Sequence, residues 1–127
     1  MNDYLLDTNI LIWHLRGKDE IVKLVEQLAE KSRLHISVIS RTEVLMGMLP
    51  KEEKVTKEFL SSLATCPVDK EVADLAGEYI RLFRKEGVTV EIPDALIGAT
   101  AAVNGLTLVT LNLKDYPMKD VKKYQAI

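Results

Sequence analysis

Residues 4–12 read YLLDTNILI, a short apolar run that stops at an acid and continues with helical spacing. We expect the two leucines before Asp7 to form a short buried strand. Thr8 or Asn9 would then cap a helix that runs to Gly17. A strand that leads directly into a helix is typical of an α/β protein.

The same alternation of apolar runs and helical patterns continues to the end of the chain. Gly and Pro residues mark the ends of the expected elements. The expected strands are residues 35–37, 65–68 and 106–110, with an edge strand through 123–124. The expected helices carry residues 10–15, 21–28 (capped by Asp19), 40–49, 55–63, 72–83 (capped by Asp69) and 95–103. This order implies a parallel α/β sheet that is covered on both faces.

The chain has 127 residues and no repeat, linker or low-complexity tract, so we expect one domain over residues 1–127. Its 47% hydrophobic and 28% charged residues are typical of a soluble globular protein. No apolar stretch approaches the roughly 20 residues that span a bilayer, and the N-terminus lacks the features of a signal peptide. The single cysteine, Cys66, excludes an internal disulfide and suits a reducing cytoplasm.

The net charge of −2 is unlike that of most nucleic-acid-binding domains, which are usually basic. Lysine and arginine residues are nevertheless grouped in residues 51–57, 81–85 and 114–123. These clusters permit a phosphate-bearing substrate without requiring one. A solvated helix face is the simpler explanation for any single cluster.

Four acidic residues lie where apolar runs stop, namely Asp7, Glu43, Asp94 and Asp115. Ligands of an open parallel sheet bind outside the carboxyl ends of its strands, so we expect these acids to converge in one cleft. Two carboxylates about 4 Å apart repel each other by ~4 kcal/mol at an effective dielectric constant near 20. A divalent cation with oxygen ligands is the simplest way to offset that repulsion.

Each acid also has a purely structural explanation. Asp7 and Asp94 suit helix N-termini, where a carboxylate favours the positive end of the helix dipole. Ser40 and Glu43 match a capping box, and the fourth acid suits a turn. However, hydroxyl groups that can cap a helix, such as Thr8, already stand beside these acids. That redundancy favours a metal site over helix capping alone.

Four stretches of the chain resemble the motifs of PIN-domain ribonucleases, in particular the VapC-type toxins of toxin–antitoxin pairs. They are residues 4–12, 36–47, 92–101 and 108–116, in the family's order and across essentially the whole chain. The first stretch alone would be weak, whereas the four together are specific. The resemblance implies a PIN-like three-layer α/β/α fold with a central parallel sheet of about five strands.

The resemblance also implies an endoribonuclease that depends on Mg²⁺ or Mn²⁺ and hydrolyses RNA phosphodiester bonds with a metal-activated water. By motif position, Asp7, Glu43 and Asp94 correspond to the family's acidic triad. Many members carry a fourth acid where Asn112 stands here, and others carry it where Asp115 stands. We expect Asp115 to complete the catalytic and metal-binding set, with Asn112 assisting.

Polar side chains near the four acids are expected to hold the carboxylates in place. These supporting residues are Thr8, Ser40, Thr110 and Asn112. Arg16 and Lys18 follow the first helix near the predicted cleft and would steer phosphate, although simple solvation explains them at least as well. The resemblance further suggests a homodimer and a cognate VapB-type antitoxin. Such an antitoxin could inhibit the protein by placing a basic side chain in the acidic cleft.

Aromatic and histidine residues are interpreted as structural. Tyr4, Trp13 and Tyr116 are expected in the core or at sheet edges rather than as platforms for RNA bases. His14 and His35 are too scattered to form a zinc site.

Two other classes of protein remain as alternatives. A magnesium-dependent phosphatase or receiver-like domain also places acids at strand ends, but a phosphatase of this kind needs a second acid where Asn9 stands. A receiver needs a lysine directly after a late strand, and residues 110–112 supply none. A non-catalytic PIN fold would only bind RNA or a partner, yet it would gain nothing from mutual carboxylate repulsion. The sequence leaves open the RNA target, the antitoxin and the number of metal ions.

Overall fold

The computed structural model describes residues 3–127 and places five parallel strands in one sheet, in the order β3-β2-β1-β4-β5. The strands are β1 (Tyr4–Leu6), β2 (Leu34–Ser37), β3 (Ala64–Cys66), β4 (Thr107–Thr110) and β5 (Lys123–Gln125). In the register of the sheet, Leu5 of β1 pairs with His35 on one side and Leu108 on the other. The first strand of the sequence is therefore the central strand of the sheet.

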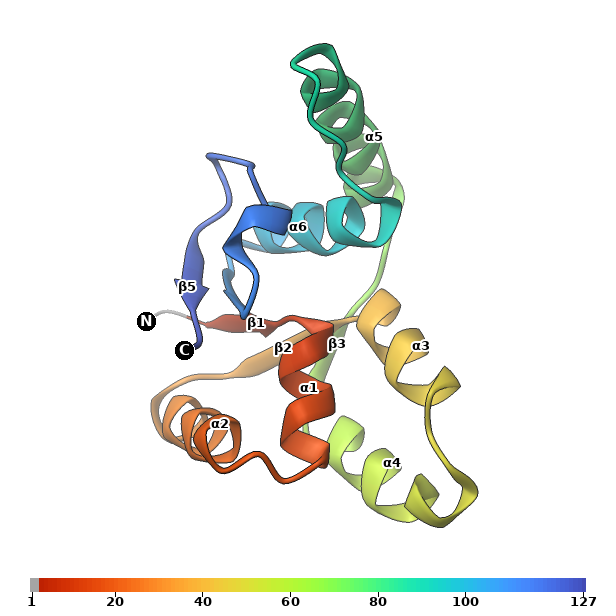
Figure 1. The fold of residues 1–127 in the computed structure, drawn as a ribbon, viewed down its shortest axis with the longest axis vertical. Coiled ribbons are helices and arrows are strands. Elements are labelled where there is room, and N and C mark those ends of the chain that lie inside the picture. The colour runs from red at the N-terminus through yellow and green to blue at the C-terminus, as the bar shows by residue number, and fades with distance from the viewer. Residues whose placement is uncertain (1–2) are drawn as a thin grey trace.

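Six α-helices surround this sheet and make it the middle of three layers (Figure 1). They are α1 (Thr8–Leu15), α2 (Asp19–Lys31), α3 (Val38–Met46), α4 (Glu53–Ser61), α5 (Lys70–Lys85) and α6 (Ile92–Asn104). Short 3₁₀ turns, η1 (Pro50–Glu52) and η2 (Leu113–Asp115), precede α4 and follow β4. The expected three-layer fold with a parallel sheet of five strands is confirmed.

The two sides of the sheet hold separate apolar clusters because successive side chains of a strand point to opposite faces. Leu5 packs in one cluster with residues of α5 and α6. Leu6 packs in the other with residues of α1, α2 and α4. Figure 1 shows α5 and α6 on one side of the strands and α1, α2 and α4 on the other.

Several helix boundaries differ from the sequence expectation because a different residue provides the cap. Asp7, and not Thr8 or Asn9, caps α1 by accepting a hydrogen bond from the Thr8 backbone amide. The third helix begins at Val38, because the Ser37 hydroxyl accepts from the Ile39 amide. The helix expected from Ser40 therefore starts earlier.

Other boundaries shift by a residue or two for similar local reasons. Asp19 is the first residue of α2 and not its cap. The third strand covers Ala64–Cys66 rather than residues 65–68, because Pro67 lacks the amide that a strand ladder needs. By contrast, Asp69 caps α5 as expected, and its Oδ1 accepts from the Val72 amide at 3.0 Å. Gly105 ends α6 in a left-handed conformation with φ of 63°.

Only Asp7 lies directly at the end of a strand and the start of a helix. Glu43 lies in the second turn of α3, and Asp94 is the third residue of α6, which follows the segment after α5 rather than a strand. The apolar runs that stop before Glu43 and Asp94 therefore do not place these acids directly at strand ends. Within residues 3–127, no helix combines the length and the apolar composition needed to cross a membrane.

Candidate active site

The buried carboxylate of Asp7 is the centre of the candidate site. It lies where β1 ends and α1 begins, and the residue is only 7% exposed. Its Oδ1 accepts hydrogen bonds from the Thr8 amide and the Tyr116 hydroxyl, each at 2.8 Å. Its Oδ2 accepts from the Thr110 hydroxyl, also at 2.8 Å. Three donors from three parts of the chain therefore fix this side chain.

The pKa of Asp7 is raised above its ordinary value, and burial is the main cause. The three hydrogen bonds oppose that shift, because they stabilise the ionised carboxylate. The negative charge of Glu43 adds to it. Asp7 is thus a desolvated acid with an acidic neighbour, which is an arrangement common at functional sites.

Hydrogen bonds through the Thr8 hydroxyl connect α1, which Asp7 caps, to Ser40 and Glu43 on α3. The Thr8 hydroxyl lies 2.7 Å from Glu43 Oε1 and 2.9 Å from the Ser40 hydroxyl, which is fully buried. A carboxylate only accepts hydrogen bonds, so the single Thr8 proton goes to Glu43 and Ser40 donates to Thr8. Glu43 therefore binds Thr8 and does not form the capping box with Ser40 that was its structural alternative.

The half-buried carboxylate of Asp94 lies beside Asp7 at the N-terminus of α6. Its Oδ1 is 3.4 Å from the Tyr116 hydroxyl, which also contacts Asp7. Burial and then the charges of Asp115 and Asp7 raise the pKa of Asp94 to about 6, with a smaller contribution from Glu43. The structure therefore brings all four predicted acids within electrostatic reach of one another.

The segment after β4 supplies the remaining predicted residues. The Asn112 amide donates to the Thr110 hydroxyl at 3.0 Å, so Asn112 supports Asp7 indirectly through its backbone. Asp115 lies in η2 and is exposed, and its charge acts on Asp94 across the site. Of the two residues, Asp115 contributes charge and Asn112 contributes a contact that positions Thr110.

Tyr116 is a site residue that the sequence did not indicate. It is a core residue as expected, only 1% exposed, yet its hydroxyl lies between the carboxylates of Asp7 and Asp94. Burial and the nearby acids raise the pKa of this phenol far above its ordinary value. A signal was available, because a buried tyrosine needs a partner for its hydroxyl and this one directly follows Asp115.

Arg16 and Lys18 lie outside this cluster. Both cations contact the half-exposed ring of Trp13, at 5.5 Å for the guanidinium of Arg16 and 4.9 Å for the ammonium of Lys18. Trp13 is therefore at the surface rather than in the core. His14 stacks on Phe59 at 4.1 Å between ring centroids, which agrees with the structural role expected for it.

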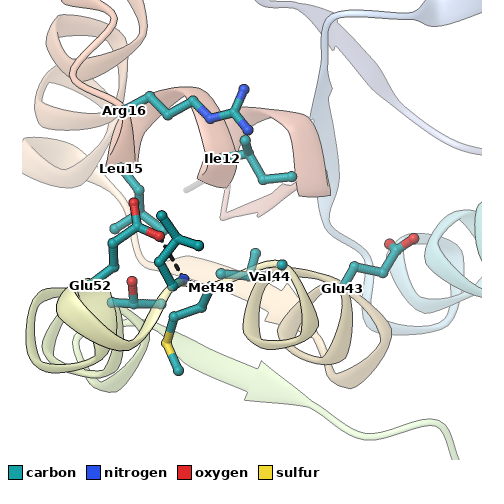
Figure 2. A pocket seen from close by; sticks show the side chains of 10 residues that line it. Ile12, Leu15, Arg16, Glu43, Val44, Met48 and Glu52 are labelled. Carbon is teal, nitrogen blue, oxygen red and sulfur yellow. Dashed lines mark hydrogen bonds between the residues drawn. The ribbon is translucent and has the colours of Figure 1, made fainter.

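A pocket of about 420 Å³ opens beside the site between α1, α3, η1 and α4. Arg16 and Glu43 line it together with apolar residues, which include Ile12, Leu15, Val44, Met48 and Leu49. Figure 2 shows Glu43 at one end of this pocket and Glu52 toward the other. The Glu43 carboxylate thus connects the pocket to the acidic cluster.

The oxygen atoms of the site fit an open magnesium site and not a closed one. Within the described residues, no three side chains of His, Cys, Asp or Glu are grouped so that they could hold a metal ion. Mg²⁺ does not need such a cage, because it keeps several waters and binds one or two carboxylates with substrate phosphates. Asp7 Oδ2 accepts one hydrogen bond and keeps a second lone pair, so it can serve as a ligand.

Sequence relatives place these features in a family. The PIN domain family matches residues 4–123. Ribonuclease VapC10 of Mycobacterium tuberculosis is 34% identical over 114 residues, which cover 90% of this chain and 86% of that protein. The tRNA(fMet)-specific endonuclease VapC of Salmonella typhimurium is 29% identical over 121 residues, which cover 91% of each chain.

Solved structures share the fold. A chain of the DNA-bound VapBC complex from Salmonella typhimurium superposes with a TM-score of 0.87 at 25% identity and covers 100% of both chains. A toxin-antitoxin complex from Klebsiella pneumoniae gives a TM-score of 0.83 at 28% identity over 98% of each chain. This chain therefore belongs to the PIN domain family, as a VapC-type member.

Proposed function

We propose that this protein is an endoribonuclease dependent on Mg²⁺ or Mn²⁺ that hydrolyses RNA phosphodiester bonds as the toxin of a toxin–antitoxin pair. The observation that carries the proposal is the pair of desolvated carboxylates, Asp7 and Asp94, held around one hydroxyl with two further acids nearby. Such a set is costly without a cation. The relatives named VapC ribonucleases support the activity.

The side chains have distinct roles in this proposal. Asp7 and Asp94 would hold the metal ion, with Glu43 and Asp115 acting on it directly or through water. A metal ion held there would supply a water acidified to a nucleophile and would neutralise charge on the phosphate. Glu43 Oε1 accepts from Thr8, and its other oxygen stays available for a proton from the attacking water. Arg16 and Lys18, which lie together on Trp13, would steer the phosphate backbone toward the acids.

The alternatives are not favoured. A phosphatase or receiver-like domain is not supported by any of the relatives above, which are named ribonucleases or toxins. A non-catalytic PIN module that binds RNA or a partner would keep the repulsion among Asp7, Asp94 and Asp115 without using it.

Cleavage of total cellular RNA by the purified, antitoxin-free protein tests the proposal. We expect discrete fragments with Mg²⁺ or Mn²⁺ and no cleavage in EDTA, because the acids alone cannot activate water. Mapping the new ends identifies the RNA and the cut sequence, for which one relative's name suggests a transfer RNA. A folded protein that leaves all RNA intact with either metal would instead support the binding-only PIN module.

We also infer that a VapB-type antitoxin binds the pocket between α1, α3, η1 and α4. The structures of similar fold are complexes of VapBC or toxin-antitoxin type. The pocket joins an apolar lining to the Glu43 carboxylate, so it suits an amphipathic segment that ends in a basic side chain. That side chain would occupy the place of the cation and block the site.

A charge placed in this pocket is expected to weaken antitoxin binding. Leu49→Asp puts a carboxylate on a half-exposed lining residue and should raise the Kd for the antitoxin encoded beside this chain by roughly 30-fold, or ~2 kcal/mol. Val55→Asp is the matched control, since Val55 is 62% exposed and does not line the pocket. Equal affinities for the two variants in calorimetry would place the antitoxin elsewhere.

A homodimer is a further part of the proposal. Leu82, Val88 and Ile92 expose apolar surface on α5, in the segment after it and at the start of α6, and a second copy of the chain would bury such surface. Light scattering of the antitoxin-free protein measures this directly, with the mass of two chains as the expected result and the mass of one chain as the contrary result.

A further inference from the structure

The hydroxyl of Tyr116 occupies a specific position between two carboxylates. It donates its only proton to Asp7 Oδ1 at 2.8 Å and lies 3.4 Å from Asp94 Oδ1. The two acids belong to segments 87 residues apart in sequence, and the buried phenol is the one side chain in the described structure whose hydroxyl lies within hydrogen-bonding distance of both carboxylates. Tyr116 therefore couples the positions of the two acids.

Contacts with α6 on one side and with β5 on the other hold Tyr116 in its buried position. A Cβ atom at Gly98 of α6 would lie 3.3 Å from Met118 Cε and 3.6 Å from Tyr116 Cδ1, so the glycine allows the Tyr116 segment to approach α6 closely. On the other side, Lys123 Nζ of β5 donates to the carbonyl oxygens of Tyr116 at 2.8 Å and Met118 at 3.0 Å. The edge strand and α6 thus clamp the segment that carries the phenol.

The hydrogen bonds of Asp7 indicate what the phenol does. A carboxylate oxygen has two lone pairs, and Oδ1 uses both of them to accept from the Thr8 amide and Tyr116. Oδ2 accepts only from Thr110 and keeps one lone pair. The arrangement therefore leaves Oδ2 as the oxygen of Asp7 that can bind a cation.

We propose that Tyr116 is a positioning residue that holds Asp7 and Asp94 ready to bind a divalent cation, with Asp7 Oδ2 as the ligand atom. The proposal rests on the metal site of the proposed function and names a residue that acts on it. Partners that orient the ligands of a metal commonly change its affinity by 10- to 100-fold when they are removed. The hydroxyl of Tyr116, and not its ring, carries this role.

Tyr116→Phe tests the role because it removes the hydroxyl and keeps the ring. We expect the Mg²⁺ concentration needed for a given rise in Tm to increase by at least about tenfold relative to the wild type. Tyr79→Phe is the matched control: Tyr79 is also a buried residue, and its hydroxyl donates to Asp120 at 2.7 Å outside the site. The control should lose stability but respond to Mg²⁺ at the wild-type concentration.

The results of this experiment distinguish a failure of the proposed metal site from a failure of the proposed role of Tyr116. A wild type whose Tm does not respond to Mg²⁺ would overturn the metal site and the role of Tyr116 with it. A wild type that responds, with Tyr116→Phe responding at the same or a lower concentration, would overturn only the role of Tyr116.

If Tyr116→Phe does not fold, the tyrosine difference spectrum of the wild type on adding Mg²⁺ decides. We expect such a spectrum in the wild type and in Tyr79→Phe, and its absence in a wild type that binds Mg²⁺ would also overturn the role.

Discussion

The Asp7→Asn variant is expected to keep the fold and to cleave RNA at least about a thousandfold more slowly than the wild type, a loss of ~4 kcal/mol of transition-state stabilisation. The reason is that the change removes the charge of the acid that lies at the centre of the site. Asparagine keeps the size of the side chain and one acceptor oxygen. Initial rates on a fragment mapped from cellular RNA, with Mg²⁺ in excess, measure the effect.

A control for this variant needs the same chemical change away from the site. Asp74→Asn on the exposed face of α5 meets that need, and its rate should equal that of the wild type. Circular dichroism and the thermal transition establish that both variants are folded. A folded Asp7→Asn protein that cleaves at the wild-type rate would remove Asp7 from the catalytic set.

The Asp94→Asn variant should be more stable than the wild type in EDTA and should lose both cleavage and the response to Mg²⁺. The folded protein raises the pKa of Asp94 to about 6 from 3.8, through burial and the charges of Asp115 and Asp7. A carboxyl whose pKa is higher in the folded protein than in the unfolded chain contributes its full stability below the unfolded pKa. That contribution to the free energy of unfolding is lost as the pH rises through the folded pKa. At neutral pH the ionised Asp94 is therefore destabilising.

The expected gain is modest because Asp94 is only half-buried. The full shift corresponds to ~3 kcal/mol, which solvent screening reduces to about 1.5 kcal/mol. Loss of the attraction between a carboxylate and the N-terminus of α6 offsets ~0.5 kcal/mol of that gain. We expect the free energy of unfolding of Asp94→Asn to exceed that of the wild type by about 1 kcal/mol at about pH 7.5, and to show no advantage at about pH 3.5, below the unfolded pKa.

Urea unfolding in EDTA at the two pH values checks this prediction. Asp74→Asn again serves as the control and should follow the wild type at both. An Asp94→Asn variant that is less stable than the wild type at the higher pH and remains active would contradict the site assignment.

The sequence predicts the fold well because the sheet depends on apolar runs that are visible locally. The runs at β1 and β4 and the helical spacing between them suffice to indicate a parallel sheet covered on both faces. Cap positions are harder to predict. Ser37 and Ser40 are both able to cap a helix, and only their contacts in the fold, Ser37 with the Ile39 amide and Ser40 with the Thr8 hydroxyl, show that Ser37 takes that role.

The sequence predicted which acids belong to the candidate site, but not how their side chains are arranged. Asp7 follows from its place at a strand end, whereas Glu43 and Asp94 reach the site from inside α3 and α6. Tyr116 could be expected in the core with a partner for its hydroxyl, but local patterns could not identify that partner, since the hydroxyl meets Asp7 across 109 positions of sequence. Its role depends on the packing of Met118 on Gly98, which no local pattern reports.

The most direct test of a cation between Asp7 and Asp94 is a crystal of the protein grown with Mn²⁺ and measured at the manganese absorption edge. The account predicts an anomalous difference peak in contact with Asp7 Oδ2 and the Asp94 carboxylate, and no such peak in Asp94→Asn. A peak bound elsewhere, or no peak at a Mn²⁺ concentration that supports RNA cleavage, would contradict it.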